Sequence, residues 1–227
     1  MPFKKKLFVS LAIAVFGVIQ FLFCVWFAIA NYDAPFSLTD NFLSELGRTT
    51  YEYSHVFNVA IVLLGLSQVP LFTMLVRLNP DDLVSMKIAS WLGIISACGI
   101  VGLGLTPENR YYVLHHVALV VWLFPMLFCW VFFFFAASRS PYVGIGFLSL
   151  SLVVVLAMIV VMLQANMTGF ELLQKVVIVC ALIWWAFVFG FVCQSGYFVL
   201  SHEQTNEKVH GESEMTYIEL LKTRGRR

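Results

Sequence analysis

Hydrophobic positions along the chain gather into six long apolar runs, separated by short polar connections. A helix needs roughly twenty residues to cross the hydrocarbon core of a bilayer, and each run is about that long. The pattern therefore predicts an all-α fold, a membrane helix bundle with six transmembrane helices over residues 1–200, followed by a cytoplasmic polar tail over residues 201–227. The predicted spans run approximately over Leu7–Ala30, Ser54–Val76, Ile88–Leu105, Tyr112–Ala137, Val143–Leu163 and Val176–Leu200.

Composition agrees with a membrane protein and excludes several function classes. Hydrophobic residues make up 60% of the chain and charged residues only 12%, whereas roughly a quarter of a soluble domain is charged. A net charge of +1, with no basic stripe, excludes nucleic-acid binding. The five cysteines lie inside apolar runs and form no CxxC pair. They indicate packing rather than a disulfide framework or a thiolate zinc site.

The positions of lysine and arginine predict the orientation. With the N-terminus inside, 11 of the 14 lysines and arginines fall on the cytoplasmic side, as membrane proteins prefer. Both termini are then cytoplasmic, and the connections at 31–53, 106–111 and 164–175 face outward. We therefore expect a multi-pass protein of the plasma membrane. Ala28–Ala30 resembles a signal-peptidase site, but its apolar run exceeds the roughly 7–15 residues of a signal peptide. We favour a retained first helix; cleavage would leave five spans.

The longest polar interruption, over residues 41–58, predicts the rim of an outward-facing pocket. A brief interfacial helix is expected from about Leu38 to Leu46. His55 and Asn58 are three residues apart and share a helix face. A polar group inside a membrane is costly without a partner, which makes such residues candidates for function. The candidate ligand-binding residues are Ser44, Glu45, His55, Asn58, Glu108, His115 and His116.

Two adjacent histidines begin the fourth span. Neighbouring helical residues point about 100° apart, so only one of His115 and His116 easily faces the bundle centre. We expect His116 to be the inward one, because Leu119 and Trp122 give the face of His115 a lipid-like character. The sequence then predicts that Glu45, His55, Asn58 and one of these histidines surround a single cavity.

Two functions from different classes fit this pattern. The first is a binding protein that holds a membrane lipid or another apolar molecule under the polar rim. The second is a metal-assisted lipid hydrolase, in which His55 and His116 (or His115) hold zinc and Glu45 or Glu108 acts as base. The chain has no HxxxH or HExxH motif and no G-x-S-x-G or Walker A motif. A transporter is a third possibility, although no pair of discontinuous spans is evident.

Several of these positions resemble the pattern of an uncharacterised family of six-helix membrane proteins, the domain of unknown function 998. The resemblance runs from the first spans through the sixth and leaves out the polar tail. It implies a six-helix fold and supports the candidate site, but it implies no activity. The positions that carry the resemblance are Ser44, Glu45, Leu46, Gly47, Asn58, Gly65, Pro107, His115 and His116.

The chain departs from the family pattern before the last span. There the resemblance leads us to expect an acidic–basic pair. This chain offers only Glu171 and, four residues later, Lys175, so it does not match the family well at this point. A looser likeness links the chain to seven-helix hydrolases of the ceramidase type, which bind zinc with histidines. This chain has one span fewer and lacks their HxxxH motif in the final span.

Overall fold

The computed structural model describes residues 3–33, 35–75, 83–139, 171–172 and 174–193. Across these ranges every long element is helical. Five of the helices are long and apolar enough to cross a membrane, which confirms the membrane helix bundle. The predicted span over Val143–Leu163 and the polar tail lie outside the described residues. The helices are α1 (Phe3–Ala30), α2 (Ser54–Leu75), α3 (Leu83–Leu105), α4 (Tyr112–Ser138) and the Gln174–Cys193 helix.

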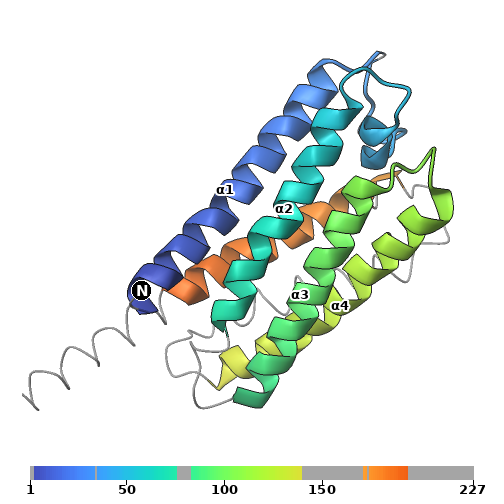
Figure 1. The fold of residues 1–227 in the computed structure, drawn as a ribbon. Helices are drawn as coiled ribbons and strands as arrows, with labels where there is room; N and C mark the ends of the chain where they lie inside the picture. The colour runs from blue at the N-terminus through green and yellow to red at the C-terminus, as the bar shows by residue number, and fades with distance from the viewer. Residues whose placement is uncertain (1–2, 34, 76–82, 140–170, 173, 194–227) are drawn as a thin grey trace, which may run out of the picture.

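Consecutive helices pack side by side: α1 against α2, α2 against α3, and α3 against α4 (Figure 1). The Gln174–Cys193 helix crosses behind α2 and α3 in this view and packs into the same core. Small residues permit the close approaches. A Cβ added to Gly65 would lie 2.7 Å from the Ala97 carbonyl oxygen, and one added to Gly99 only 2.4 Å from the Trp122 nitrogen. Lipid is as apolar as a helix surface, so this close packing is what holds the helices together.

An aromatic core fills the half of the bundle distant from the residue 31–53 connection. The rings of Trp130 and Trp184 stack with centroids 5.3 Å apart. Phe133 meets Trp184 edge-to-face, and Phe72 of α2 contacts Trp185. Trp130, Trp184, Phe72 and Phe133 are fully buried. These contacts join α2 and α4 through the Gln174–Cys193 helix.

We call residues 31–53 the cap segment and the end of the bundle that it covers the cap end. The predicted interfacial helix over Leu38–Leu46 is wrong in its bounds. The chain instead turns at residues 38–40, where the Ser37 hydroxyl accepts a hydrogen bond from the backbone N–H of Asp40. It then forms a 3-10 helix, η1, over Leu43–Gly47. Leu43, Leu46 and Gly47 are buried, so η1 lies against the bundle.

Candidate functional site

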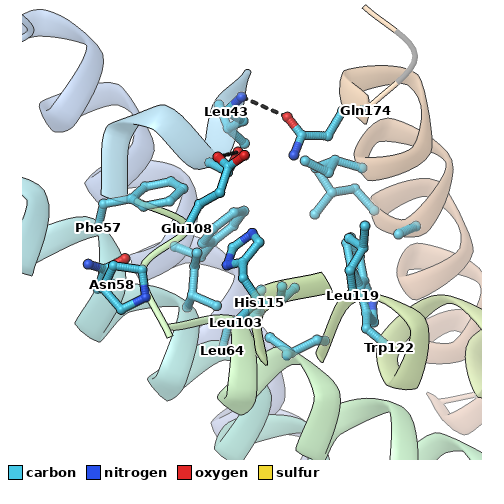
Figure 2. Close-up of a pocket in the computed structure, with 18 of the residues that line it drawn as sticks. Leu43, Phe57, Asn58, Leu64, Leu103, Glu108, His115, Leu119, Trp122 and Gln174 are labelled. Atoms are coloured by element: carbon cyan, nitrogen blue, oxygen red, sulfur yellow. Dashed lines mark hydrogen bonds between the residues drawn. The ribbon is translucent and has the colours of Figure 1, made fainter. Parts of the chain in front are cut away.

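A cavity of about 90 Å³ lies at the cap end, beneath η1 and among the helices (Figure 2). Most of its wall is apolar and includes Leu103, Leu119 and Trp122. A cavity with such walls accepts hydrocarbon more readily than water. The hydroxyl, amide, carboxylate and imidazole groups of the lining belong to Ser44, Asn58, Glu108, His115 and Gln174.

Glu108 brings a carboxylate to the cavity and also ties the cap segment to the connection between α3 and α4. The Ser44 hydroxyl donates to Glu108 Oε2 over 3.2 Å. The Arg48 guanidinium lies 3.8 Å from the same oxygen and 3.5 Å from Glu45 Oε1. The Arg48 side chain is 35% exposed, so solvent weakens both ion pairs, and each is worth about 1 kcal/mol or less.

His115 points its ring into the cavity below Glu108 (Figure 2). Its Nδ1 lies 2.8 Å from the carbonyl oxygen of Thr106, at the end of α3. A carbonyl oxygen only accepts hydrogen bonds, so Nδ1 must carry the hydrogen. In the neutral ring Nε2 then keeps a free lone pair. The backbone of one helix thus fixes the tautomer of a histidine on the next.

Asn58 holds the other side of η1. Its Nδ2 donates to the Gly47 carbonyl oxygen over 2.9 Å. A Cβ added to Gly47 would lie 2.3 Å from Asn58 Oδ1, so only glycine permits this approach without a shift. Asn58 therefore both lines the cavity and anchors the cap segment above it.

Gln174 connects the cap segment to the last described helix. The Leu43 amide donates to Gln174 Oε1 over 2.7 Å, as the dashed line in Figure 2 marks. The neighbouring Lys175 ammonium donates to the backbone carbonyls of Asn41 and Glu171. The bonds to Leu43 and Asn41 join residues 131 and 134 positions apart, and they hold the cap segment against the Gln174–Cys193 helix.

Glu45 lies in the cap segment but does not line the cavity. Its Oε2 accepts a hydrogen bond from the side-chain amide of Asn41 over 2.9 Å and lies 3.3 Å from the Tyr32 hydroxyl. The Tyr32 hydroxyl is in turn 2.6 Å from the Tyr51 hydroxyl. Burial raises the pKa of the Tyr32 hydroxyl, and the neighbouring Tyr51 and Glu45 raise it further. Glu45 thus organises the cap segment from within.

Two of the expected histidines lie elsewhere, and the predicted convergence on one cavity is wrong for both of them and for Glu45, none of which lines the cavity. His55 is exposed, with Nδ1 3.1 Å from the Glu52 carbonyl oxygen. His116 is also exposed, with Nδ1 2.8 Å from the Tyr112 carbonyl oxygen. Each ring thus has a hydrogen-bond partner in a backbone carbonyl three or four residues earlier in the chain. The inward histidine is His115, because Leu119 and Trp122 on its face line the cavity rather than the lipid.

The positions of the described side chains do not support a metal site. Across the described ranges, no three His, Cys, Asp or Glu side chains come together in a way that could hold a metal ion. The two histidines proposed as zinc ligands, His55 and His116, are exposed and do not line the cavity to which Glu108 contributes.

The comparisons with known proteins agree with the resemblance seen in the motifs. A family model described as a protein of unknown function, DUF998, matches residues 15–190. The chain belongs to this family. No curated protein and no solved structure matches it. The DUF998 match spans every residue that lines the cavity, from Phe21 to Trp185.

The DUF998 site contains residues that the sequence did not single out. Gln174, Trp122 and Leu43 line the cavity, and Arg48 lies beside two carboxylates. Arg48 and Gln174 had a usable signal: both are polar and stand next to apolar runs on the side predicted to face outward. Trp122 and Leu43 had none, because an apolar residue that faces a cavity looks the same in sequence as one that faces lipid.

Proposed function

We propose that this DUF998 protein binds a lipid or another apolar molecule in the cap-end cavity. The observation that carries the proposal is the lining itself: apolar walls with a few polar groups gathered beneath the cap segment. Ligand sites in proteins have this character, with a mostly apolar surface and a small number of polar groups that fix the orientation. The apolar walls take hydrocarbon, and Glu108, His115 and Gln174 take the polar end.

The proposed location is the plasma membrane, with the cap segment outside and both termini in the cytoplasm. The distribution of lysine and arginine supports this orientation. Thr50 is exposed in the cap segment. In intact cells, Thr50→Cys should react with a membrane-impermeant maleimide above the level of the unmodified chain. Labelling that occurs only after cell lysis would show instead that the cap segment faces the cytoplasm.

Native mass spectrometry of protein purified in a mild detergent tests the binding function. The expected result is a retained adduct of lipid mass, close to one per chain. The cavity can be filled from within by Ala181→Phe, since Ala181 is buried and lines it. Ala186→Phe is the matched control on the same helix, because Ala186 is exposed.

The two variants make the test specific. Ala181→Phe should lose most of the adduct while retaining the elution volume and helical circular dichroism of the parent protein, and Ala186→Phe should keep the adduct. Protein with no adduct and no saturable lipid binding would overturn the proposal. So would a folded Ala181→Phe variant that retains as much lipid as the parent. The metal-assisted hydrolase has no specific observation in its favour among the described residues.

A further inference from the structure

The charge of the cavity lining distinguishes among lipids. Among the described residues of the lining, Glu108 is the one with a carboxylate group, and none is lysine or arginine. Arg48 approaches Glu108 from the cap segment and is shared with Glu45. A phosphate or carboxylate entering the cavity would meet a like charge without a dedicated cation, which is unfavourable in a partly desolvated site.

Two lining side chains, Glu108 and His115, each keep a hydrogen-bond acceptor atom. The contacts of Glu108 with Ser44 and Arg48 both reach Oε2, and no other described residue binds Oε1, which is left as an acceptor. His115 uses Nδ1 to donate to Thr106, so Nε2 of the neutral ring is also an acceptor. A ligand that satisfies both groups must bring hydrogen-bond donors such as hydroxyl groups.

Hydrogen-bond donors also line the cavity. A backbone N–H must face an oxygen, so the Leu43 amide fixes the Gln174 side chain with its oxygen toward η1 and leaves the NH₂ group to donate. The Trp122 ring lines the cavity, and its buried Nε1–H has no hydrogen-bond partner among the described residues. A buried donor without a partner is costly, and a carbonyl oxygen of a ligand would satisfy it.

We infer that the ligand is a neutral lipid whose polar end carries free hydroxyl groups next to a carbonyl, as in a monoacylglycerol. This inference rests on the proposed binding function. Glu108 Oε1 and His115 Nε2 accept from the hydroxyl groups, and the amide of Gln174 or the indole of Trp122 donates to the ester carbonyl. An ammonium head is less suitable, because Arg48 already lies beside Glu108 and a second cation must shed its water.

A competition experiment tests the head-group preference with the chain length held constant. Delipidated protein in mild detergent is mixed with equal amounts of monoolein, oleic acid, oleoyl lysophosphatidic acid and oleylamine, and the adducts are separated by native mass spectrometry. The monoolein adduct should exceed each charged competitor by about tenfold, the size expected for one or two hydrogen bonds to a charged or buried group.

Three variants place the preference on the named side chains. Glu108→Gln keeps the shape but removes the charge, so discrimination against oleic acid should fall by about tenfold. His115→Phe removes the Nε2 acceptor, and monoolein binding should fall by a similar factor. His116→Phe is the matched control, since His116 is exposed on the adjacent position. It should bind like the parent.

Each result bears on one of the two proposals. Equal binding of all four lipids, or preference for an anion or for oleylamine, would overturn the head-group inference and leave lipid binding intact. Saturable binding of none of them, together with no retained adduct, would remove the binding function itself. A preference for monoolein that is unchanged in folded Glu108→Gln and His115→Phe would show that these side chains do not recognise the polar end.

Discussion

The cap end and the aromatic core are built from similar apolar helices but are held together differently. In the aromatic core, the indole rings of Trp130 and Trp184 stack and exclude space for a ligand. At the cap end, the same helices leave a cavity, and half-buried polar groups such as Glu108 and His115 face it. The core is therefore suited to stability, and the cap end to the binding that we propose.

The difference shows what packing does in a membrane. Helices in lipid gain little from burying apolar surface against one another, so close contact and hydrogen bonds decide their association. The aromatic core supplies the close contact. The cap segment supplies hydrogen bonds at one end, where Asn58, Glu108 and Gln174 each hold a different part of it. Loss of a core ring should therefore cost more stability than loss of any one cap bond.

Trp184→Ala should give the largest effect. Trp184 is fully buried against Trp130 and Phe133, and truncation would leave a large void. Truncation of a buried tryptophan to alanine lowers the free energy of unfolding by about 3–5 kcal/mol. We expect a large fall in the thermal unfolding midpoint in detergent. Trp91→Ala is the matched control, because Trp91 is 66% exposed, and it should unfold near the parent. Equal midpoints for the two variants would contradict the account of the core.

Gly99→Ala should come next and connects the two regions. An added Cβ would lie 2.4 Å from the backbone nitrogen of Trp122, so α3 and α4 must separate. Overpacking costs about 1–3 kcal/mol, and the displaced Trp122 should also weaken lipid retention.

Gly190→Ala is the control for Gly99→Ala, since nothing lies within 4 Å of a Cβ at Gly190. That variant should retain both its unfolding midpoint and its lipid adduct. A neutral Gly99→Ala variant would show that the helices approach less closely than the structure indicates.

The fold was largely predictable from the sequence because hydropathy reports span length directly. Predicted and observed spans differ by only a few residues at each described end; Ser54 and Tyr112, for example, begin α2 and α4 as expected. The bounds of η1 were not predictable, because a five-residue helix held by tertiary bonds has no periodicity of its own. Its position depends on Gln174 and Asn58, which are distant in sequence or on another helix.

The site was predictable in its residue types but not in its geometry. Ser44, Asn58, Glu108 and His115 line one cavity, whereas Glu45, His55 and His116 do not. The error came from treating apolar neighbours as a sign of lipid. Leu119 and Trp122 line an apolar cavity instead, and periodicity alone does not distinguish the two environments.

Asn58→Leu should have a smaller effect than the two core variants and should act on the cap end. The substitution keeps the branched shape and the number of heavy atoms but removes the bond to the Gly47 carbonyl. Leaving a half-buried carbonyl without its donor costs about 1–2 kcal/mol. The cap segment should also become more susceptible to limited proteolysis, which can be followed by mass spectrometry of the fragments.

Asn31→Leu is the control for Asn58→Leu. Asn31 makes a comparable bond to the Phe27 carbonyl, but on the exposed end of α1. It should be nearly neutral in stability and should leave the proteolysis of residues 31–53 unchanged. If both variants accelerated cleavage equally, Asn58 would have no special part in holding the cap segment.

Tyr32→Phe should give the smallest effect, with a pH dependence that identifies it. The Tyr32 hydroxyl lies within hydrogen-bond distance of Tyr51 and Glu45, and its loss should cost about 1 kcal/mol near neutral pH. Because folding raises the pKa of this hydroxyl above its ordinary value of 10.0, the folded state favours the protonated form. The stabilisation is therefore complete below about pH 10 and is lost as the pH rises further.

Unfolding midpoints of the parent and of Tyr32→Phe should differ by a constant amount from pH 7 to 9 and converge above pH 10. A gap that widens at high pH would mean that the ionised hydroxyl is the stabilising form, contrary to its position beside the Glu45 carboxylate.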